Sequence, residues 1–255
     1  MLIKHKLIAN TTVLILAMVL MLLLLNYSSS SLQHDINVAE NIGNVKSLVL
    51  DLRRNEKDFL ARKDLKYSTQ FNDNMQSLMQ QITMLENDFD AIGINTNDTG
   101  AMKSILNEYM KHFNSLVKLQ QKIGLNPKEG LYGNLRSAVH DVEELIGSDD
   151  YQLLSQMLQL RRNEKDFMLR LDEKYIARLT GNVDILLTTL ANTSFDDNKK
   201  EQISSLIGSY KNAFLELTDA QKELGLDSKS GLLGQVRATV HKVDSNLASL
   251  VSLSK

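Results

Sequence analysis

From about Leu32 onward, apolar residues recur three, four and seven positions apart along the chain. This spacing places them on one face of an α-helix. Val45, Leu48, Leu52 and Phe59 form one such stripe. No segment shows the strict apolar–polar alternation of a half-buried strand. The pattern therefore predicts an all-α protein.

A polar interruption of this stripe occurs twice. The residues Leu-Arg-Arg-Asn-Glu-Lys-Asp-Phe occupy 52–59 and return unchanged at 160–167, 108 positions later. In each copy an asparagine and a glutamate stand where the stripe calls for an apolar residue. Repetition at a fixed period is typical of duplicated structural units. We expect two related helical units, each with a polar layer on its core face.

The residues alone leave two interpretations of the polar layer open. The layer can be satisfied internally, with Arg54 paired to Asp58 one turn later and a buried Asn or Glu that fixes the register of the bundle. Alternatively, the paired arginines face a cavity and hold an anion, since a guanidinium suits bidentate binding of a carboxylate.

A second repeat, with a shift of 101, relates Gly124–Arg136 to Gly225–Arg237. Each copy contains Gly-Leu-x-Gly-x-x-Arg, and a glycine inside a helix costs about 1 kcal/mol relative to alanine. Close helix packing or the approach of a ligand to a helix N-terminus would explain these glycines. Asn126, Pro127 and Glu129 fit the N-cap, N1 and N3 positions of a new helix. The same shift aligns three further pairs: Tyr109 with Tyr210, Phe113 with Phe214, and His140 with His241.

Turn signals divide this part of the chain into six expected helices, two of them long. The first spans about 60 residues, or roughly 90 Å of helix. If the two long helices run through both levels, the duplication predicts two stacked four-helix bundles. The expected ranges are 32–92, 101–123, 126–146, 148–191, 199–224 and a last helix that runs to Lys255 with no sign of ending.

The first residues predict a membrane anchor. Residues 7–25 are almost wholly apolar, and a helix of this length reaches about 28 Å, enough for the hydrocarbon core of a bilayer. A cleavable signal peptide is the alternative, but no Ala-x-Ala-like site follows. Lys4 and Lys6 precede the apolar run, so the positive-inside rule places residues 1–6 in the cytoplasm and residues 28–255 outside.

Neither the composition nor the sequence motifs favour catalysis or the binding of a metal or cofactor. The 255 residues include no cysteine, so a disulfide framework and a thiolate metal site are excluded, and the net charge of −2 does not indicate nucleic-acid binding. His140 and His241 lack acidic or cysteine partners at metal-ligand spacing. No nucleophile, phosphate-loop or dinucleotide motif occurs. We therefore expect neither an enzyme nor a bound cofactor or metal.

The doubled Leu-Arg-Arg-Asn-Glu-Lys-Asp-Phe segment, with a Gly-Leu-x-Gly-x-x-Arg element in each unit, resembles the helical bimodular sensor domain of bacterial methyl-accepting chemotaxis proteins. This resemblance covers the chain from about Leu32 to its end. It implies six helices in two stacked four-helix bundles, a periplasmic location in the bacterial inner membrane, and a homodimer. Members of the family sense small carboxylates, C4 dicarboxylates in the membrane-proximal module and acetate in the distal one, and arginines hold the ligand. The candidates that the motifs give are Arg53, Arg54, Arg161, Arg162 and Arg237, with Arg136, Tyr67 and Tyr175 as further residues that can reach a ligand.

The sequence therefore favours the periplasmic sensor region of a transmembrane chemoreceptor that binds a small organic acid and signals by displacement of its last helix. Cytoplasmic signalling partners would be reached only through a C-terminal part that this sequence does not contain. The input domain of a sensor histidine kinase, which can bind a periplasmic protein, is the alternative. A purely structural membrane-anchored coiled coil is a third class. It predicts that replacing Arg53 or Arg161 by alanine leaves function intact.

Overall fold

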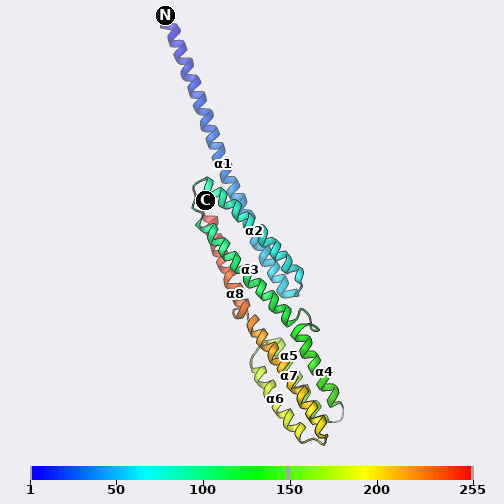
Figure 1. Ribbon diagram of the computed structural model, residues 1–255. Coiled ribbons are helices and arrows are strands. Elements are labelled where there is room, and N and C mark those ends of the chain that lie inside the picture. The colour runs from blue at the N-terminus through cyan, green and yellow to red at the C-terminus, as the bar shows by residue number, and fades with distance from the viewer. Residues whose placement is uncertain (1, 148–149, 254–255) are drawn as a thin grey trace. The chain divides into compact units, whose positions relative to one another are not determined.

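The computed structural model describes residues 2–147 and 150–253. Within these residues the secondary structure is entirely helical, which confirms the predicted all-α class. Figure 1 shows the helices joined by short turns. Their bounds are α1 Leu2–Arg62, α2 Leu65–Ala91, α3 Asn97–Ile123, α4 Gly130–Ile146, α5 Tyr151–Arg170, α6 Lys174–Ala191, α7 Asp197–Leu224 and α8 Gly231–Leu253.

The predicted long helix 32–92 is wrong at its start and in its middle, while its expected end agrees with the end of α2 at Ala91. Helix α1 begins at Leu2 and continues without a break through the four serines to Arg62, so the apolar N-terminal run and the first amphipathic segment form one helix. The chain then reverses, and α2 returns alongside α1, where Asn41 Nδ2 donates to Asp88 Oδ2 at 2.6 Å. The segment that the periodicity predicts as one long helix is therefore a hairpin of two helices.

The reversal is built from one residue in a left-handed conformation followed by an aspartate. Lys63 has φ 52°, and its backbone N–H donates to Phe59 O at 2.7 Å, which closes the last turn of α1. Asp64 Oδ1 then accepts from the backbone N–H of Lys66 at 3.0 Å, at the start of α2. Neither glycine nor proline occurs at this turn, so no conventional helix-stop signal is present there.

The second copy repeats the same turn, so the predicted long helix 148–191 is also wrong. It is divided into α5 and α6 at Leu171, which has φ 52° as Lys63 does. Asp172 Oδ1 accepts from the Lys174 backbone N–H at 3.0 Å. Helix α5 starts after Asp150, whose side chain caps it, while the expected start at residues 148–149 lies outside the described residues.

The duplicated glycine element is a turn, and the predicted helix start at Asn126 is wrong. Helix α4 begins at Gly130, and residues 124–129 form the loop before it. Gly124 and Gly130 have φ values of 122° and 56°, and residues other than glycine rarely adopt such backbone conformations. A Cβ at Gly133 would lie 2.5 Å from Lys128 O. The glycines are therefore explained by the close approach of the loop to the first turn of α4, and the same geometry precedes α8.

The described chain divides into two compact units. Unit 1 contains residues 1–53, 73–105 and 243–255, and unit 2 contains residues 54–72 and 106–242. In unit 2, α4 packs against α7 and α5, and α6 packs against α5 and α7, so these four helices form a closed ring around one core. Their buried stripes consist mainly of Leu, Ile, Val, Met and aromatic side chains, with polar residues such as Asn163 and Glu164 of α5 among them.

In unit 1, polar contacts connect α1, α2, α3 and α8. Lys103 of α3 pairs with Glu86 of α2, and Arg53 Nη1 of α1 lies 3.2 Å from Asp244 Oδ1 of α8. The core between the charged faces is apolar and includes Val45, Leu85 and Leu250. The helices that contribute to unit 1 thus satisfy the amphipathic pattern of the sequence.

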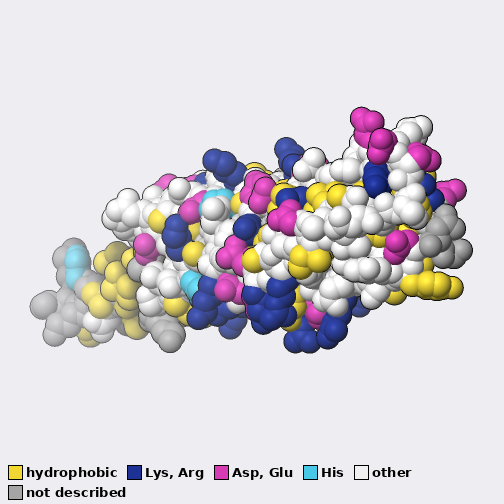
Figure 2. Space-filling view, turned by 90° about the horizontal axis from the view of Figure 1, so that it is seen from below, with side chains coloured by type: hydrophobic (Ala, Val, Ile, Leu, Met, Phe, Trp, Pro, Cys, Tyr) yellow, Lys and Arg dark blue, Asp and Glu magenta, His cyan; other side chains and the backbone are white. Residues whose placement is uncertain are grey.

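One segment of α1 is suited to a membrane. Ile3–Ser29 is a helix of 27 residues, long and apolar enough to cross a bilayer, and none of its central window is buried inside the protein. Outside this segment the surface is charged with both signs, and Figure 2 shows Lys and Arg side chains gathered along the lower edge of the visible face. These features support a membrane-anchored protein with a polar helical part.

Candidate functional site

The duplicated polar layer is a glutamate–tyrosine hydrogen bond in each copy. Tyr210 OH of α7 donates to Glu164 Oε2 of α5 at 2.9 Å, and Tyr109 of α3 donates to Glu56 of α1 in the same way. Beneath each pair lies an edge-to-face contact of two phenylalanines, with ring centroids 5.6 Å apart for Phe167 and Phe214. The glutamates are thus paired inside the protein, whereas the buried Nδ2 atoms of Asn55 and Asn163 have no hydrogen-bond partner among the described residues, so the layer is satisfied internally only in part.

Glu164 is the most deeply buried of the charged groups in this layer, with 2 % of its side chain exposed. Lys165 Nζ donates to its second oxygen at 2.6 Å, and Arg161 Nε lies 3.8 Å from Oε2. Burial raises the pKa of the Tyr210 phenol far above its ordinary value, and the neighbouring Glu164 raises it further. Tyr210 therefore stays protonated and donates to the carboxylate.

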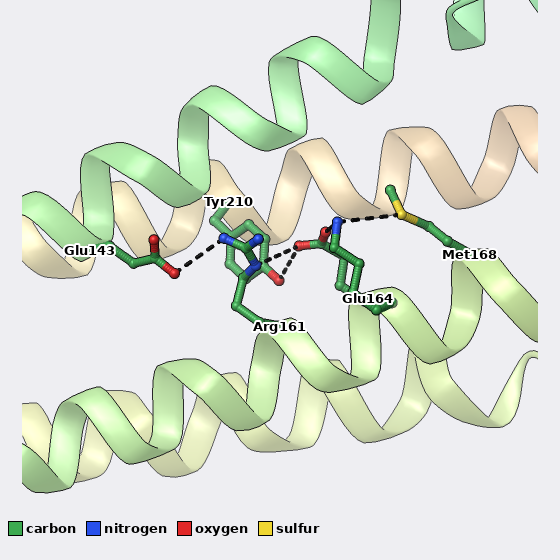
Figure 3. A network of polar contacts seen from close by, with 6 residues as sticks. Glu143, Arg161, Glu164, Met168 and Tyr210 are labelled. Atoms are coloured by element: carbon green, nitrogen blue, oxygen red, sulfur yellow. Dashed lines mark hydrogen bonds and ion pairs between the residues drawn. The ribbon is translucent and has the colours of Figure 1, made fainter. Parts of the chain in front are cut away.

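Arg161 connects this buried layer to the neighbouring helix. Its Nη1 donates to Glu143 Oε1 of α4 at 3.1 Å, so the guanidinium stands between Glu143 and Glu164 (Figure 3). The other copy of the repeat contains an equivalent ion pair, between Arg53 and Asp244. Arg53 corresponds to Arg161 by the shift of 108 residues, and Asp244 corresponds to Glu143 by the shift of 101 residues. The first arginine of each Arg-Arg pair thus serves helix packing.

The second arginine of each Arg-Arg pair and the remaining candidate residues do not belong to the buried polar layer. Arg54 and Arg162 are exposed, and exposed Arg237 donates to Ser228 Oγ at 3.3 Å. Tyr67 is half-buried under the Arg62 guanidinium, and Tyr175 is buried with the Lys174 and Arg178 side chains over its ring. Of the eight candidates, the structure brings Arg136 and Arg161 into one groove.

That groove lies within unit 2 and has a volume of about 970 Å³. The residue at the α1–α2 turn, the loop that follows α3, one face of α4 and one face of α5 contribute to its lining. Five formally positive side chains stand against two carboxylates in this lining. The cations are Lys63, Lys128, Arg136, Arg161 and Lys165, and the carboxylates are Glu143 and Glu164.

Three of the five cations have no carboxylate partner among the described residues: Lys63, Lys128 and Arg136. Lys63 is half-buried with its ammonium 5.4 Å from the centre of the Tyr132 ring, and burial lowers its pKa below the ordinary lysine value. An ammonium that has lost hydration without gaining a counter-ion is stabilised by an anion that approaches it. The groove is therefore suited to an anionic ligand.

The groove's other side chains add shape and weaker polarity. Leu125, Pro127, Tyr132 and Met168 give it apolar surface, while Asn126, Ser137 and His140 offer hydrogen-bonding groups. His140 was aligned with His241 by the repeat, but the sequence assigned it no role. Small organic anions combine a carbon skeleton with charged ends, and this lining matches both parts.

The sequence missed Lys63, Lys128 and Lys165 as groove residues. Lys165 belongs to the repeated segment, whereas Lys63 faces the groove because the chain reverses there. One signal was available: Lys63 in the first copy corresponds to Leu171 in the second, and Tyr132 corresponds to Leu233. These differences between otherwise similar copies indicated a position where the two units have diverged.

A neighbouring face of α4 borders a different surface. Asp141, Glu144 and Glu201 lie around a shallow depression between α4 and α7, with no lysine or arginine in its lining. Helix α4 therefore presents basic and acidic faces to two separate depressions in unit 2.

Comparison with known proteins does not assign the chain to a family. No protein-family model matches the chain, and a sequence comparison with curated proteins gives no match. The functional argument therefore rests on the groove, the duplication and the apolar N-terminal helix.

Proposed function

We propose that the chain is the membrane-anchored sensor region of a transmembrane chemoreceptor, and that the groove lined by Lys63, Arg136 and Arg161 binds a small carboxylate. The observation that carries the proposal is the excess of positive charge in the groove, with three cations that lack a carboxylate partner among the described residues. Carboxylates meet such groups through charge-assisted hydrogen bonds, and guanidinium groups bind them in a bidentate manner. The ligand class is small organic acids, among them acetate and the C4 dicarboxylates.

The rest of the chain agrees with a sensor. The apolar segment Ile3–Ser29 can anchor the protein, with the helices after it in the periplasm. The closed ring of α4–α7, together with the contacts that link α1, α2, α3 and α8, supports two stacked four-helix bundles shared by a duplicated chain. A homodimer in the inner membrane is part of the same proposal.

The signalling step is a shift between two populations of helix arrangements. A ligand changes such an equilibrium only when its affinity differs between the two states. The groove takes residues from the α1–α2 turn, α4 and α5, so a bound anion would favour the arrangement in which these elements are closest. We propose that the change reaches the last helix, α8, and displaces it. Crosslinking yields between cysteines placed in α8 of two copies should then change when ligand is added; identical yields would contradict the step.

A thermal-shift screen of the full chain in detergent tests direct sensing. Acetate, malate, succinate, fumarate and citrate are added singly at matched ionic strength. An anion present at 100 times its Kd stabilises the folded state by about 2.7 kcal/mol. For a chain of this size, that corresponds to roughly 5–10 °C in the melting temperature.

Chloride at the same ionic strength is the control for non-specific screening of the basic groove. A rise with at least one carboxylate, absent with chloride, supports the proposal. No rise with any of the five anions would contradict it and favour a domain that binds another protein.

A further inference from the structure

Arg161 differs from the unpaired cations of the groove because a carboxylate of the protein already holds it. Its Nη1 donates to Glu143 Oε1 at 3.1 Å, across the interface between α4 and α5 (Figure 3). An anion that enters the groove therefore meets Arg161 with one of its donors occupied. The strength of that contact determines how much of the guanidinium a ligand can use.

The two carboxylates beside Arg161 are held very differently. Glu164 is 2 % exposed and accepts hydrogen bonds from Tyr210 and Lys165, so it is fixed. Glu143 is 37 % exposed, and its contact with Arg161 is a single hydrogen bond. Ion pairs with this degree of exposure are worth about 0.2–1 kcal/mol. Glu143 can therefore be exchanged, whereas Glu164 cannot.

The guanidinium is also incompletely satisfied in this arrangement. Arg161 Nε is buried 3.8 Å from Glu164 Oε2 without a hydrogen-bond partner among the described atoms, so an anion in the groove meets the guanidinium at its Nη end. A carboxylate that lies in the plane of a guanidinium can make two parallel hydrogen bonds, which a single contact to Glu143 does not provide. A ligand carboxylate thus has a geometric advantage over the resident one.

We propose that Glu143 is an internal competitor of the ligand: an incoming carboxylate displaces it from Arg161 and exchanges the α4–α5 ion pair for a protein–ligand contact. This inference rests on the proposed function, since it requires the groove to bind an anion. Glu143 then acts as a specificity-determining residue. Ligands with a second anionic group that reaches Arg136 or Lys63 compete with it better than ligands that carry one charge.

The duplication provides a matched control. Asp244 holds Arg53 at 3.2 Å as Glu143 holds Arg161 at 3.1 Å, but neither Asp244 nor Arg53 lines the groove. Replacing Asp244 by asparagine removes an equivalent ion pair without freeing a groove cation. Glu144 supplies the second control, because it follows Glu143 on α4 but lines the acidic depression and not the groove.

The test is a calorimetric titration of malate into the full chain in detergent, for the unmodified protein, Glu143→Gln, Glu144→Gln and Asp244→Asn. We expect Glu143→Gln to lower the Kd for malate about two- to fivefold, the equivalent of the pair it removes. Glu144→Gln should change it less than about 1.5-fold, since its charge is separated from the groove and screened by salt. Asp244→Asn should leave it unchanged.

A double-mutant cycle distinguishes displacement of Glu143 from Arg161 from a general change in the electrostatic field of the groove. If Glu143 competes through Arg161, the gain from Glu143→Gln disappears when Arg161 is replaced by glutamine. A gain that persists in the Arg161→Gln background, or equal gains from Glu143→Gln and Glu144→Gln, would overturn the proposal. Should Glu143→Gln not fold, Glu143→Asp shortens the reach to Arg161 and should raise the affinity in the same direction.

The two proposals fail in different ways. If malate binds the unmodified protein and Arg136→Ala weakens it, but Glu143→Gln has no effect, the groove is the site and the competitor role is wrong. If neither the unmodified protein nor Glu143→Gln binds malate or any of the other four carboxylates of the thermal-shift screen, both proposals are contradicted.

Discussion

The buried hydrogen bond between Tyr210 and Glu164 should make Tyr210→Phe strongly destabilising. The substitution keeps the ring and removes the phenol oxygen, which is 2.9 Å from Glu164 Oε2. Glu164 is 2 % exposed, so water cannot replace the lost donor. Hydrogen bonds to a charged group contribute about 1.5–3 kcal/mol, and we expect a loss of that size in the free energy of unfolding.

The duplicated pair provides the comparison. Tyr109 donates to Glu56, which is only half-buried, and both tyrosines belong to unit 2. Water can reach part of the Glu56 carboxylate after Tyr109→Phe, so we expect a smaller loss of about 1 kcal/mol. The Phe71 contact with the ring at position 109 and the Phe167–Phe214 contact remain in both variants.

Urea denaturation of the full chain, followed by circular dichroism at 222 nm, measures both free energies. The larger loss should also appear as a fall of about 3–12 °C in melting temperature for Tyr210→Phe. A loss below about 0.5 kcal/mol, or equal losses for the two variants, would refute the reasoning that burial of Glu164 sets the cost.

Two further predictions concern the turn and the groove. Gly133→Ala should destabilise the protein by about 1–3 kcal/mol in urea denaturation, because its Cβ would lie 2.5 Å from Lys128 O. Gly181→Ala, in α6 with nothing within 4 Å of the new Cβ, should instead stabilise it by about 0.5–1 kcal/mol; equal effects of the two would contradict the close-approach explanation. Malate affinity should fall as the pH rises through the pKa of Lys63, which burial lowers, since the neutral amine no longer attracts an anion. Lys63→Arg should keep the affinity at alkaline pH in the same titrations, and a decline identical to that of the unmodified protein would exclude Lys63 as the cause.

The all-α class and the duplication could be predicted because both follow from patterns of residues close together in the sequence. Helical periodicity is a property of neighbouring residues, and the repeated segment identified the polar layer in both units. The alignment of Tyr109 with Tyr210 even paired the residues that donate to Glu56 and Glu164. What the pattern could not show is which of the two interpretations of that layer holds, because the partner lies on another helix.

The chain reversals at Lys63 and Leu171 escaped prediction for a physical reason. Both residues have φ 52° without being glycine, and apolar helical periodicity resumes after each turn. The available signal was an aspartate followed two residues later by a lysine in both copies, Asp64 and Asp172. Tertiary packing of the hairpin stabilises a local conformation that sequence propensity disfavours.

The groove was only partly predictable for the same reason. Arg136 and Arg161 were expected as candidates from their motifs, but their joint position depends on the contact between α4 and α5. Lys63 enters the groove through a turn that the sequence did not reveal. The roles of the remaining candidates, including Arg237 and Tyr175, stay predictions.

The most direct test of anion binding in the groove uses the repeat as its own control. Arg136 lines the groove, while Arg237, its counterpart 101 residues later, does not and donates to Ser228 instead. Calorimetric titration of malate into the full chain should show binding that is unchanged in Arg237→Ala and about tenfold weaker in Arg136→Ala, equivalent to about 1.4 kcal/mol. Equal affinities for the two variants, or no binding of any of the five screened carboxylates by the unmodified protein, would contradict the assignment of the groove as the ligand site.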